Sequence, residues 1–310
     1  MAVLGAAVVA VLLASGIWFA VRATMSGSTP NPPPPPTPRA SAAAVPAGSM
    51  PAYRHVFLIL MENHGYPSIV GSPSAPYING TLIADGALAA NYHAITHPSL
   101  PNYVALTAGQ TAGIHTDCNP GPGCTADVRN LGDELERAGK SWKAYEESIP
   151  APCTTSDAGQ YAVRHDPFVY FDDVRSNAAR CAAHVVPLPQ LQLDTESGLV
   201  PSFSFITPNL LHDMHDGTVR EGDVWLQQEV PGLLSVPSSL VIVTWDEAAD
   251  DNATNQVATL FDGAGVAKGA VVRGPANHYS LLHTVETLEG VTPLTMNDAG
   301  YPVMTGMFAG

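Results

Sequence analysis

Short apolar runs alternate along the chain with segments whose apolar residues recur at helical spacing. Each run is bounded by polar or turn residues, as is typical of a buried strand. The predicted strands are His55–Met61, Ala87–Tyr92, Ser141–Tyr145, Ser202–Ile206, Leu240–Trp245 and Gln256–Phe261. The predicted helices are Ala75–Asp85, a helix that starts near Ser99, Asn130–Ala138, Asp223–Ser235 and Tyr279–Glu289. The long segment Glu146–Leu193 is expected to be rich in loops.

Strands that alternate with helices predict an α/β fold with a mainly parallel sheet flanked by helices. In such sheets, ligands bind beyond the carboxyl ends of the strands. Polar residues suited to metal binding or proton transfer follow several of the predicted strands. These clusters are Glu62–Asn63, Ser99, His212–Asp216 and Asp246–Glu247. One polar strand end is ordinary, but their recurrence in one chain favours an active site at this edge of the sheet.

Ser99 lies in the stretch Thr96–Gly109 (THPSLPNYVALTAG), where a predicted strand leads into a helix. Free backbone N–H groups at a helix N-terminus favour a bound anion, and phosphate in particular. Pro101 suits the first helical turn, where its missing N–H is no loss. An ordinary capped helix has the same pattern, and spacing alone favours that interpretation for Ser99.

Carboxylates follow two of the strands, with Glu62 and Asn63 after the first and Asp246 and Glu247 after the fifth. Gathered at one edge, these groups repel one another unless a cation lies between them. Oxygen ligands favour a hard divalent ion such as Mg²⁺, Ca²⁺ or Mn²⁺ over Zn²⁺. The alternative for Asp246 and Glu247 is that they simply begin a solvated acidic loop.

Histidines add candidates for acid–base chemistry. The stretch His212–Asp216 holds two histidines and two aspartates, which could protonate a leaving oxygen or bind a metal. Its alternative is a polar loop with a capping aspartate. His278 opens a predicted helix and could face the same place, and His165 is a lone histidine shortly before a proline.

Charge and the N-terminal sequence limit the class of protein. The chain has 28 acidic and 13 basic residues and a formal net charge of -15, which argues against nucleic acid as a partner. Residues 1–23 contain an apolar run near the length of roughly 20 residues that spans a bilayer, so we expect a signal-anchor or a signal peptide. Residues 24–50 form a proline-rich linker to a catalytic domain at 51–310. We expect an exported monomer, either extracellular or anchored to the outer face of the cytoplasmic membrane.

The chain has four cysteines, and an even number of cysteines in an exported chain favours disulfides. Cys118 and Cys124 flank a short loop of proline and glycine. The preferred pairing is Cys118 with Cys124 and Cys153 with Cys181, and two other connectivities remain open. A zinc site is the rival, but the chain lacks the close Cys/His spacing of such sites.

Several ordered stretches resemble the bacterial phosphoesterase family of acid phosphatases and phospholipases C, a branch of the alkaline phosphatase superfamily. The similarity is greatest to the short secreted acid phosphatases of actinobacteria, including mycobacterial ones that act on phosphoinositides. The stretches are HVFLILMENHG, HPSLPNYVALTAG, RHDPFVYF, PNLLHDMHDG, LVIVTWDE and NHYSLL, which extend from residue 55 to about residue 288. The resemblance implies an alkaline-phosphatase-like fold.

The resemblance also implies roles for particular residues. Ser99 is the expected nucleophile. The expected ligands of a divalent metal are Glu62, Asn63, Ser99, Asp246 and Glu247. The expected catalytic histidines are His215, His278 and His165, and the expected substrate-binding residues are His97, Asn102, His212 and Asp216. Two departures from the larger phospholipases, His-Gly-Tyr-Pro after Glu62–Asn63 and Ala-Ala-Asp-Asp-Asn after Asp246–Glu247, affect the mouth of the site.

We therefore expect metal-dependent hydrolysis of phosphate monoesters through a phosphoserine at Ser99. The expected substrates include lipid-linked esters such as phosphoinositide phosphates. One alternative is a phospholipase C that cleaves phosphodiester head groups at the same site. A second is a surface-tethered binding domain without activity, which Ser99 together with the predicted carboxylate ligands argues against.

Overall fold

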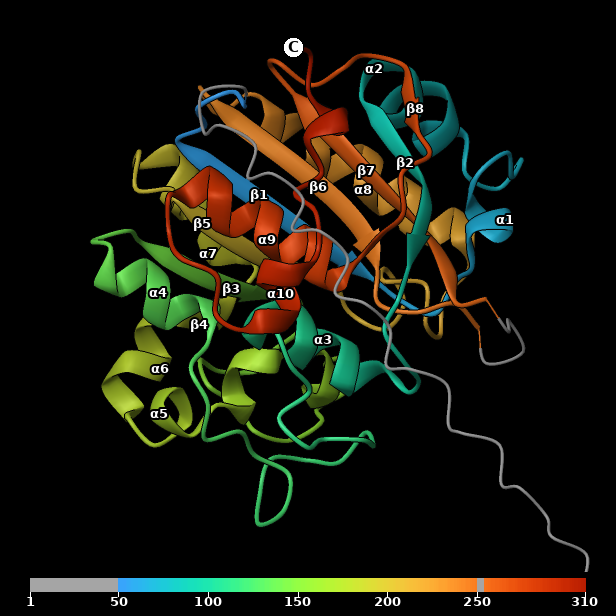
Figure 1. The fold of residues 1–310 in the computed structure, drawn as a ribbon. Helices are drawn as coiled ribbons and strands as arrows, with labels where there is room; N and C mark the ends of the chain where they lie inside the picture. Colours follow the sequence, from blue (N-terminus) through green and yellow to red (C-terminus); the bar gives the residue numbers. More distant parts are fainter. Residues whose placement is uncertain (1–49, 250–253) are drawn as a thin grey trace, which may run out of the picture. The chain divides into compact units, whose positions relative to one another are not determined.

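In the computed structural model, which describes residues 50–249 and 254–310, a nine-stranded sheet runs through the domain in the order β4-β3-β5-β1-β6-β7-β2-β8, with β9 beside β2 (Figure 1). The strands are β1 His55–Met61, β2 Ala87–His93, β3 Trp142–Glu146, β4 Val185–Pro187, β5 Phe203–Thr207, β6 Ser239–Trp245, β7 Gln256–Gly263, β8 Ala270–Val272 and β9 Ala276–Asn277.

Helices cover both faces of the sheet, with α9 and α8 on opposite sides (Figure 1). The α-helices are α1 Tyr66–Ile69, α2 Ile83–Asp85, α3 Ser99–Ala108, α4 Leu131–Arg137, α5 Asp172–Arg175, α6 Ala178–His184, α7 Pro189–Glu196, α8 Val219–Leu234, α9 His278–Glu289 and α10 Met296–Gly300. A π-helix spans Ile78–Leu82, and 3₁₀ turns span Val163–His165, Pro167–Tyr170 and Thr305–Met307.

The central strands are buried on both faces, which explains their unbroken apolar sequence. In β6, every residue is buried, and in β1, every residue after His55 is buried. Strand β1 pairs in parallel with β5, where Val56 is opposite Phe203, and with β6, where His55 is opposite Ser239. The predicted α/β fold with a mainly parallel sheet is confirmed.

Strand β7 is antiparallel to both of its neighbours, β6 and β2. Two successive reversals give β2 the same direction as β6. The residues after β2 therefore emerge at the same edge as those after β1, β5 and β6. This topology brings Ser99, which follows β2, to the carboxyl edge of the parallel strands.

Several elements differ from the prediction. Helix α8 begins at Val219, before the predicted Asp223, because Thr218 and Glu221 form a capping box. The segment predicted as Ala75–Asp85 is a π-helix followed by the short α2. The segment predicted to be loop-rich also contains the edge strand β4 and three short α-helices.

Two disulfides join Cys118 to Cys124 and Cys153 to Cys181, the pairing that the spacing favours. The predicted N-terminal segment 1–23 lies outside the described residues, as does the linker apart from Met50, and the domain boundaries stay predictions. None of the helices in the described part of the chain has the length and apolarity that a membrane crossing requires.

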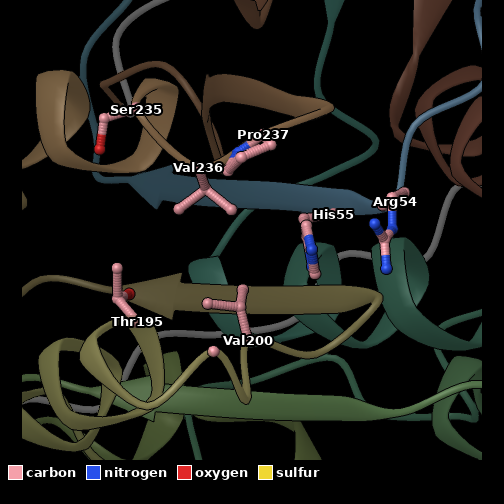
Figure 2. Close-up of a pocket in the computed structure, with 8 residues that line it drawn as sticks. Arg54, His55, Thr195, Val200, Ser235, Val236 and Pro237 are labelled. Carbon is pink, nitrogen blue, oxygen red and sulfur yellow. The ribbon is translucent and has the colours of Figure 1, made fainter.

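A pocket of about 360 Å³ lies at the amino edge of the sheet, opposite the predicted site (Figure 2). Its lining includes Arg54 and His55 at the start of β1, Val200 before β5 and Pro237 before β6. It contains none of the predicted site residues. We therefore place the chemistry by the polar side chains at the carboxyl edge, not by this cavity.

A buried carboxyl group in α9 makes stability depend on pH. Burial, together with the nearby Asp298, raises the pKa of Glu286 to about 9. The folded state therefore favours protonated Glu286, and this stabilisation is complete below the unfolded pKa near 4.5 and is lost as pH rises through 9. We expect the melting temperature of Glu286→Gln to fall less between pH 5 and pH 9 than that of the wild type. At pH 9 the difference should have grown by about 5 °C in favour of the variant.

Thermal unfolding of both proteins across this pH range measures the effect. Glu196→Gln, which removes an exposed carboxylate from α7, serves as the control and should follow the wild type. Parallel profiles for wild type and Glu286→Gln would show that Glu286 titrates normally.

Candidate functional site

Ser99 is the first residue of α3 and is almost fully buried. Its hydroxyl lies 3.1 Å from Glu62 Oε2 and 3.4 Å from Glu247 Oε1, so either carboxylate can accept its hydrogen bond. The next residue along α3, Leu100, donates its N–H to Asp117 Oδ1 at 2.9 Å, and Pro101 has no N–H. The predicted nucleophile therefore has carboxylate partners for its hydroxyl at the start of a helix.

Three carboxyl side chains surround the Ser99 hydroxyl at the ends of two adjacent strands. Glu62 follows β1, and Asp246 and Glu247 follow β6, with at most 2% of each residue exposed. The Asn63 N–H donates to Asp246 Oδ1 at 3.0 Å, and the Asp246 N–H donates to the Met61 carbonyl, which ties the two strand ends together. The predicted meeting of these carboxylates is seen in the structure.

Burial makes negative charge costly here. Burial raises the pKa of Glu62 well above its usual range, and the charges of Asp246 and Asp213 add to the effect. Burial likewise raises the pKa of Asp246 to about 7, although the Asn63 N–H favours its charged form. These carboxyl groups need either protons or a cation.

The donor set fits a hard divalent cation. Among the described residues, Asn63 Oδ1 and Asp246 Oδ2 are buried without a hydrogen-bond partner. Unpaired buried oxygens are rare because they lose their hydration without compensation. Oxygen atoms from carboxylates and an amide suit Mg²⁺, Ca²⁺ or Mn²⁺. A second possible group shares Glu62 and adds His165 and His215, whose ligand atoms lie within 4.8 Å of one another.

His165 lies between two carboxyl groups. Its Nε2 is 3.3 Å from Glu62 Oε1, and its Nδ1 is 3.2 Å from Asp213 Oδ2. Burial lowers the pKa of His165 well below its usual range, so the ring is neutral and suited to binding a cation. The Tyr103 ring stacks on His165 with centroids 5.4 Å apart, and its hydroxyl donates to Glu62.

His215 lies at the rim of this cluster. Its Nδ1 is 2.7 Å from Asp216 Oδ1, and its Nε2 is 3.3 Å from Arg164 Nη2. Asp216 thus orients the His215 ring. The predicted contact of Asp216 with substrate stays a prediction. His212 pairs instead with Glu147 at 2.9 Å, and its predicted contact with substrate also stays a prediction.

The position of His278 requires a correction. Its Nε2 donates to the Asp246 carbonyl at 2.6 Å, and its Nδ1 accepts a hydrogen bond from the Tyr92 hydroxyl at 2.8 Å. Both ring nitrogens are therefore occupied, and burial lowers the pKa of His278 to about 4. A neutral histidine held in this way fixes the strand end that carries Asp246, and it does not offer a proton to substrate.

Asn102 requires a second correction. Its Oδ1 accepts hydrogen bonds from the N–H groups of Ile95 and Thr96, and its Nδ2 donates to the carbonyls of Thr96 and Pro98. The hydrogen bonds of the fully buried Asn102 amide are therefore all made within the turn that leads to Ser99. This turn contains the cis His97–Pro98 bond. The predicted contact of Asn102 with substrate is replaced by a structural role.

His97 Nδ1 lies 2.7 Å from Glu247 Oε2, and a third of the His97 side chain is exposed. The predicted contact of His97 with substrate stays a prediction. The sequence prediction assigned no role to Tyr103, Asp213 or Arg164. Asp213 stood within the singled-out His212–Asp216 cluster, and Arg164 within the stretch RHDPFVYF. Tyr103 gave no separate signal, because an aromatic residue in an apolar helix is ordinarily part of the core.

Comparison with known sequences identifies relatives along most of the domain. The Phosphoesterase family matches residues 73–292. The phosphatidylinositol-3-phosphatase of Mycobacterium tuberculosis is 36% identical over 266 residues, which are 84% of this chain and 85% of that protein. A probable acid phosphatase of Kluyveromyces lactis is 30% identical over 76% of this chain, and the match spans 58% of the yeast protein.

Solved structures share the fold at low identity. A protein of the alkaline phosphatase superfamily from Vibrio parahaemolyticus superposes with a TM-score of 0.58 at 14% identity, covering 84% of this chain and 71% of that one. A phosphonate monoester hydrolase of Agrobacterium radiobacter gives 0.56 at 14% identity, with coverages of 82% and 77%. The predicted alkaline-phosphatase-like fold is thereby confirmed.

The structural role of Asn102 can be tested by its removal. We expect Asn102→Ala to lower the free energy of unfolding by about 2–4 kcal/mol, because the N–H groups of Ile95 and Thr96 lose their acceptor. Urea denaturation measures this loss. Asn297→Ala, which removes a more exposed amide bonded to the Gly109 carbonyl, should cost less than about 1 kcal/mol. Unchanged stability with a raised KM would instead support direct substrate binding.

Proposed function

The chain belongs to the phosphoesterase family, and from this premise we propose that it hydrolyses phosphate monoesters with Ser99 as the nucleophile. Hydrolysis of a phosphate ester agrees with the names of its relatives, a phosphatidylinositol-3-phosphatase and several acid phosphatases. One observation carries the proposal. The hydroxyl of Ser99, the first residue of α3, lies 3.1 Å from a carboxylate oxygen of the buried Glu62.

A divalent cation is the proposed cofactor. Glu62, Asn63, Asp246, Glu247 and the Ser99 hydroxyl would hold it, because they supply buried oxygen donors that two strand ends bring together. When bound, such a cation lowers the pKa of a coordinated hydroxyl and offsets negative charge on phosphoryl oxygens. Mg²⁺, Ca²⁺ and Mn²⁺ match these donors better than Zn²⁺ does.

The proposed reaction has two displacements at phosphorus. In the first, Ser99 Oγ attacks phosphorus while its proton moves to a carboxylate that accepts its hydrogen bond. The bond between phosphorus and the ester oxygen breaks as the bond to Oγ forms, which leaves a phosphoserine. In the second, water attacks that phosphoserine, inorganic phosphate departs and Oγ regains a proton.

The leaving alkoxide needs a proton, and we assign its delivery to His215. A quarter of the His215 side chain is exposed, Asp216 holds Nδ1, and Nε2 lies 3.3 Å from Arg164 Nη2 in the group that includes Glu62. His278 is a poorer candidate because it is fully buried and its Nε2 proton is donated to the Asp246 carbonyl. After the first displacement, the neutral His215 can take a proton from the attacking water.

The proposed substrate class is a phosphate monoester, with phosphoinositide phosphates included because the mycobacterial relative bears that activity in its name. The two disulfides suggest an exported protein. An exported enzyme would meet esters outside the cytoplasm. Anchoring through residues 1–23 is part of this proposal.

Removal of the Ser99 hydroxyl tests the nucleophile. We expect Ser99→Ala to lower kcat/KM for p-nitrophenyl phosphate by about 10³-fold or more, with the melting temperature little changed. Intact-mass analysis after an acid quench should show a phosphorylated wild type and an unmodified variant. Ser74→Ala, which removes an exposed hydroxyl from a loop, should retain full activity. Ordinary turnover by Ser99→Ala would refute the assignment.

Metal binding can be measured without an activity assay. After chelation and dialysis, we expect Mg²⁺, Ca²⁺ or Mn²⁺ to raise the melting temperature, since a ligand at about 100 times its Kd stabilises the folded state by about 2.7 kcal/mol. Asp246→Asn should abolish most of the shift and keep the acceptor for the Asn63 N–H. Asp85→Asn, at an exposed carboxylate, is the matched control. Equal shifts in all three proteins would place the ion elsewhere.

A further inference from the structure

Arg164 lies beside the proposed proton donor in an otherwise acidic site. Its Nη2 is 3.3 Å from His215 Nε2, and its Nε is 3.9 Å from Asp117 Oδ2. About 20% of its side chain is exposed, so the guanidinium lies at the boundary between the cluster and solvent. The contact with Asp117 exceeds hydrogen-bond length, so it attracts the guanidinium without using up its donors.

Asp117 connects this cation to the helix of the nucleophile. Its Oδ1 accepts the Leu100 N–H at 2.9 Å, one residue after Ser99. A carboxylate at the start of α3 interacts favourably with the helix dipole. Asp117 therefore binds the first turn of α3 with one carboxylate oxygen and attracts Arg164 with the other.

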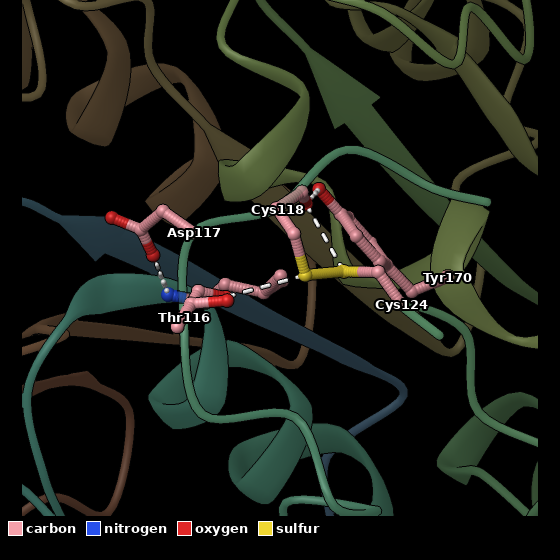
Figure 3. The surroundings of a disulfide bond; sticks show 6 residues. Thr116, Asp117, Cys118, Cys124 and Tyr170 are labelled. Atoms are coloured by element: carbon pink, nitrogen blue, oxygen red, sulfur yellow. Dashed lines mark hydrogen bonds between the residues drawn. A yellow bond between two sulfur atoms is a disulfide. The ribbon is translucent and has the colours of Figure 1, made fainter. Parts of the chain in front are cut away.

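The disulfide loop fixes Asp117 in turn. Cys118, its chain neighbour, is bonded to Cys124, and the Tyr170 hydroxyl donates to the Cys118 carbonyl at 2.7 Å (Figure 3). A short cross-linked loop restricts the backbone next to Asp117. The position of Asp117 thus follows from covalent and hydrogen-bond constraints.

A phosphate ester needs such a cation on electrostatic grounds. Glu62, Asp246 and Asp213 are buried in the cluster, and carboxylates repel a phosphate dianion. Eight of the other described Lys and Arg residues form ion pairs with carboxylates outside this cluster. Arg54 lines the pocket at the opposite edge, and Arg273 is exposed and lies near Tyr66. Arg164, in contrast, contacts a histidine of the cluster.

Guanidinium geometry suits a monoester in particular. Its planar fork can bind two phosphate oxygens at once, and a charged oxygen is a better acceptor than the neutral nitrogen of His215. A monoester dianion has three terminal oxygens, whereas a diester has two and carries one charge. The fork therefore gains more from a monoester. Its move to phosphate frees His215 Nε2, which can take up a proton from solvent at its exposed side and then pass it to the leaving oxygen.

Building on the proposed function, we propose that Arg164 binds the terminal oxygens of the substrate phosphoryl group and favours monoester dianions over diesters. Asp117 is the positioning residue that keeps the guanidinium at the start of α3. The same chemistry binds inorganic phosphate, the product, which provides a probe independent of turnover.

Kinetics of the full chain with bound divalent metal test the proposal. We expect Arg164→Gln to raise both KM for p-nitrophenyl phosphate and the inhibition constant of inorganic phosphate by about 10-fold or more. For bis(p-nitrophenyl) phosphate, kcat/KM should change by less than about 3-fold, so the preference for the monoester falls. Arg164→Lys should recover part of the phosphate affinity, because it restores the charge without the fork.

Two further variants separate positioning from general damage. Asp117→Asn keeps an acceptor for the Leu100 N–H but loses the charge, so KM should rise by about 3- to 10-fold with kcat nearly unchanged. Arg137→Gln removes an exposed arginine of α4 and should match the wild type in every measurement.

The outcomes distinguish this proposal from the function on which it rests. Ordinary turnover by Ser99→Ala would refute the proposed function. An inactive Ser99→Ala, together with an Arg164→Gln variant whose phosphate inhibition constant stays within twofold of wild type, would refute only the role of Arg164. Equal losses on monoester and diester would refute the specificity. If Arg164→Gln does not fold, Arg164→Lys decides, since an unchanged monoester preference in that variant also refutes it.

Discussion

Glu62 and Asp246 are buried within electrostatic range of each other, and no Lys or Arg of the described residues forms an ion pair with either one. Buried carboxyl groups in this arrangement must be protonated or share a cation, because isolated charge in a low-dielectric interior is costly. The surroundings reflect this requirement. A neutral His165, the Tyr103 hydroxyl and the Asn63 backbone amide all contact these two carboxyl groups.

Sheet topology produces this concentration of charge. Strands β1, β5 and β6 are parallel neighbours, so the residues that follow them emerge together. Strand β7 is antiparallel to both β6 and β2, so β2 has the same direction as β6, and Ser99 emerges at the same edge. If β2 ran antiparallel to β6, the predicted nucleophile would emerge at the opposite edge, near the pocket that Arg54 and His55 line.

The start of α3 is held from several sides. Asn102 uses all its hydrogen-bonding capacity on the turn before Ser99, and Asp117 accepts the N–H of Leu100 just after it. Each contact restricts the backbone that carries the hydroxyl. A serine fixed in this way loses little conformational entropy when it attacks a bound ester, which is one of the main contributions of an enzyme to rate.

The sequence by itself determined the residue types at the strand ends. The place of Glu62, Asn63 and Asp246 at a sheet edge could be predicted because apolar runs reveal buried strands, and polar residues after them must lie at that edge. For Ser99, spacing alone favoured an ordinary helix cap, and its expected role came from the resemblance to a family. Tertiary structure alone decided where side chains point. His278 and Asn102 have suitable chemistry for a site, yet packing turns their polar atoms toward backbone groups and, for His278 Nδ1, toward the Tyr92 hydroxyl. Contacts between distant segments, such as Arg164 with Asp117 and His215, depend on that packing and leave no periodic signal in the sequence.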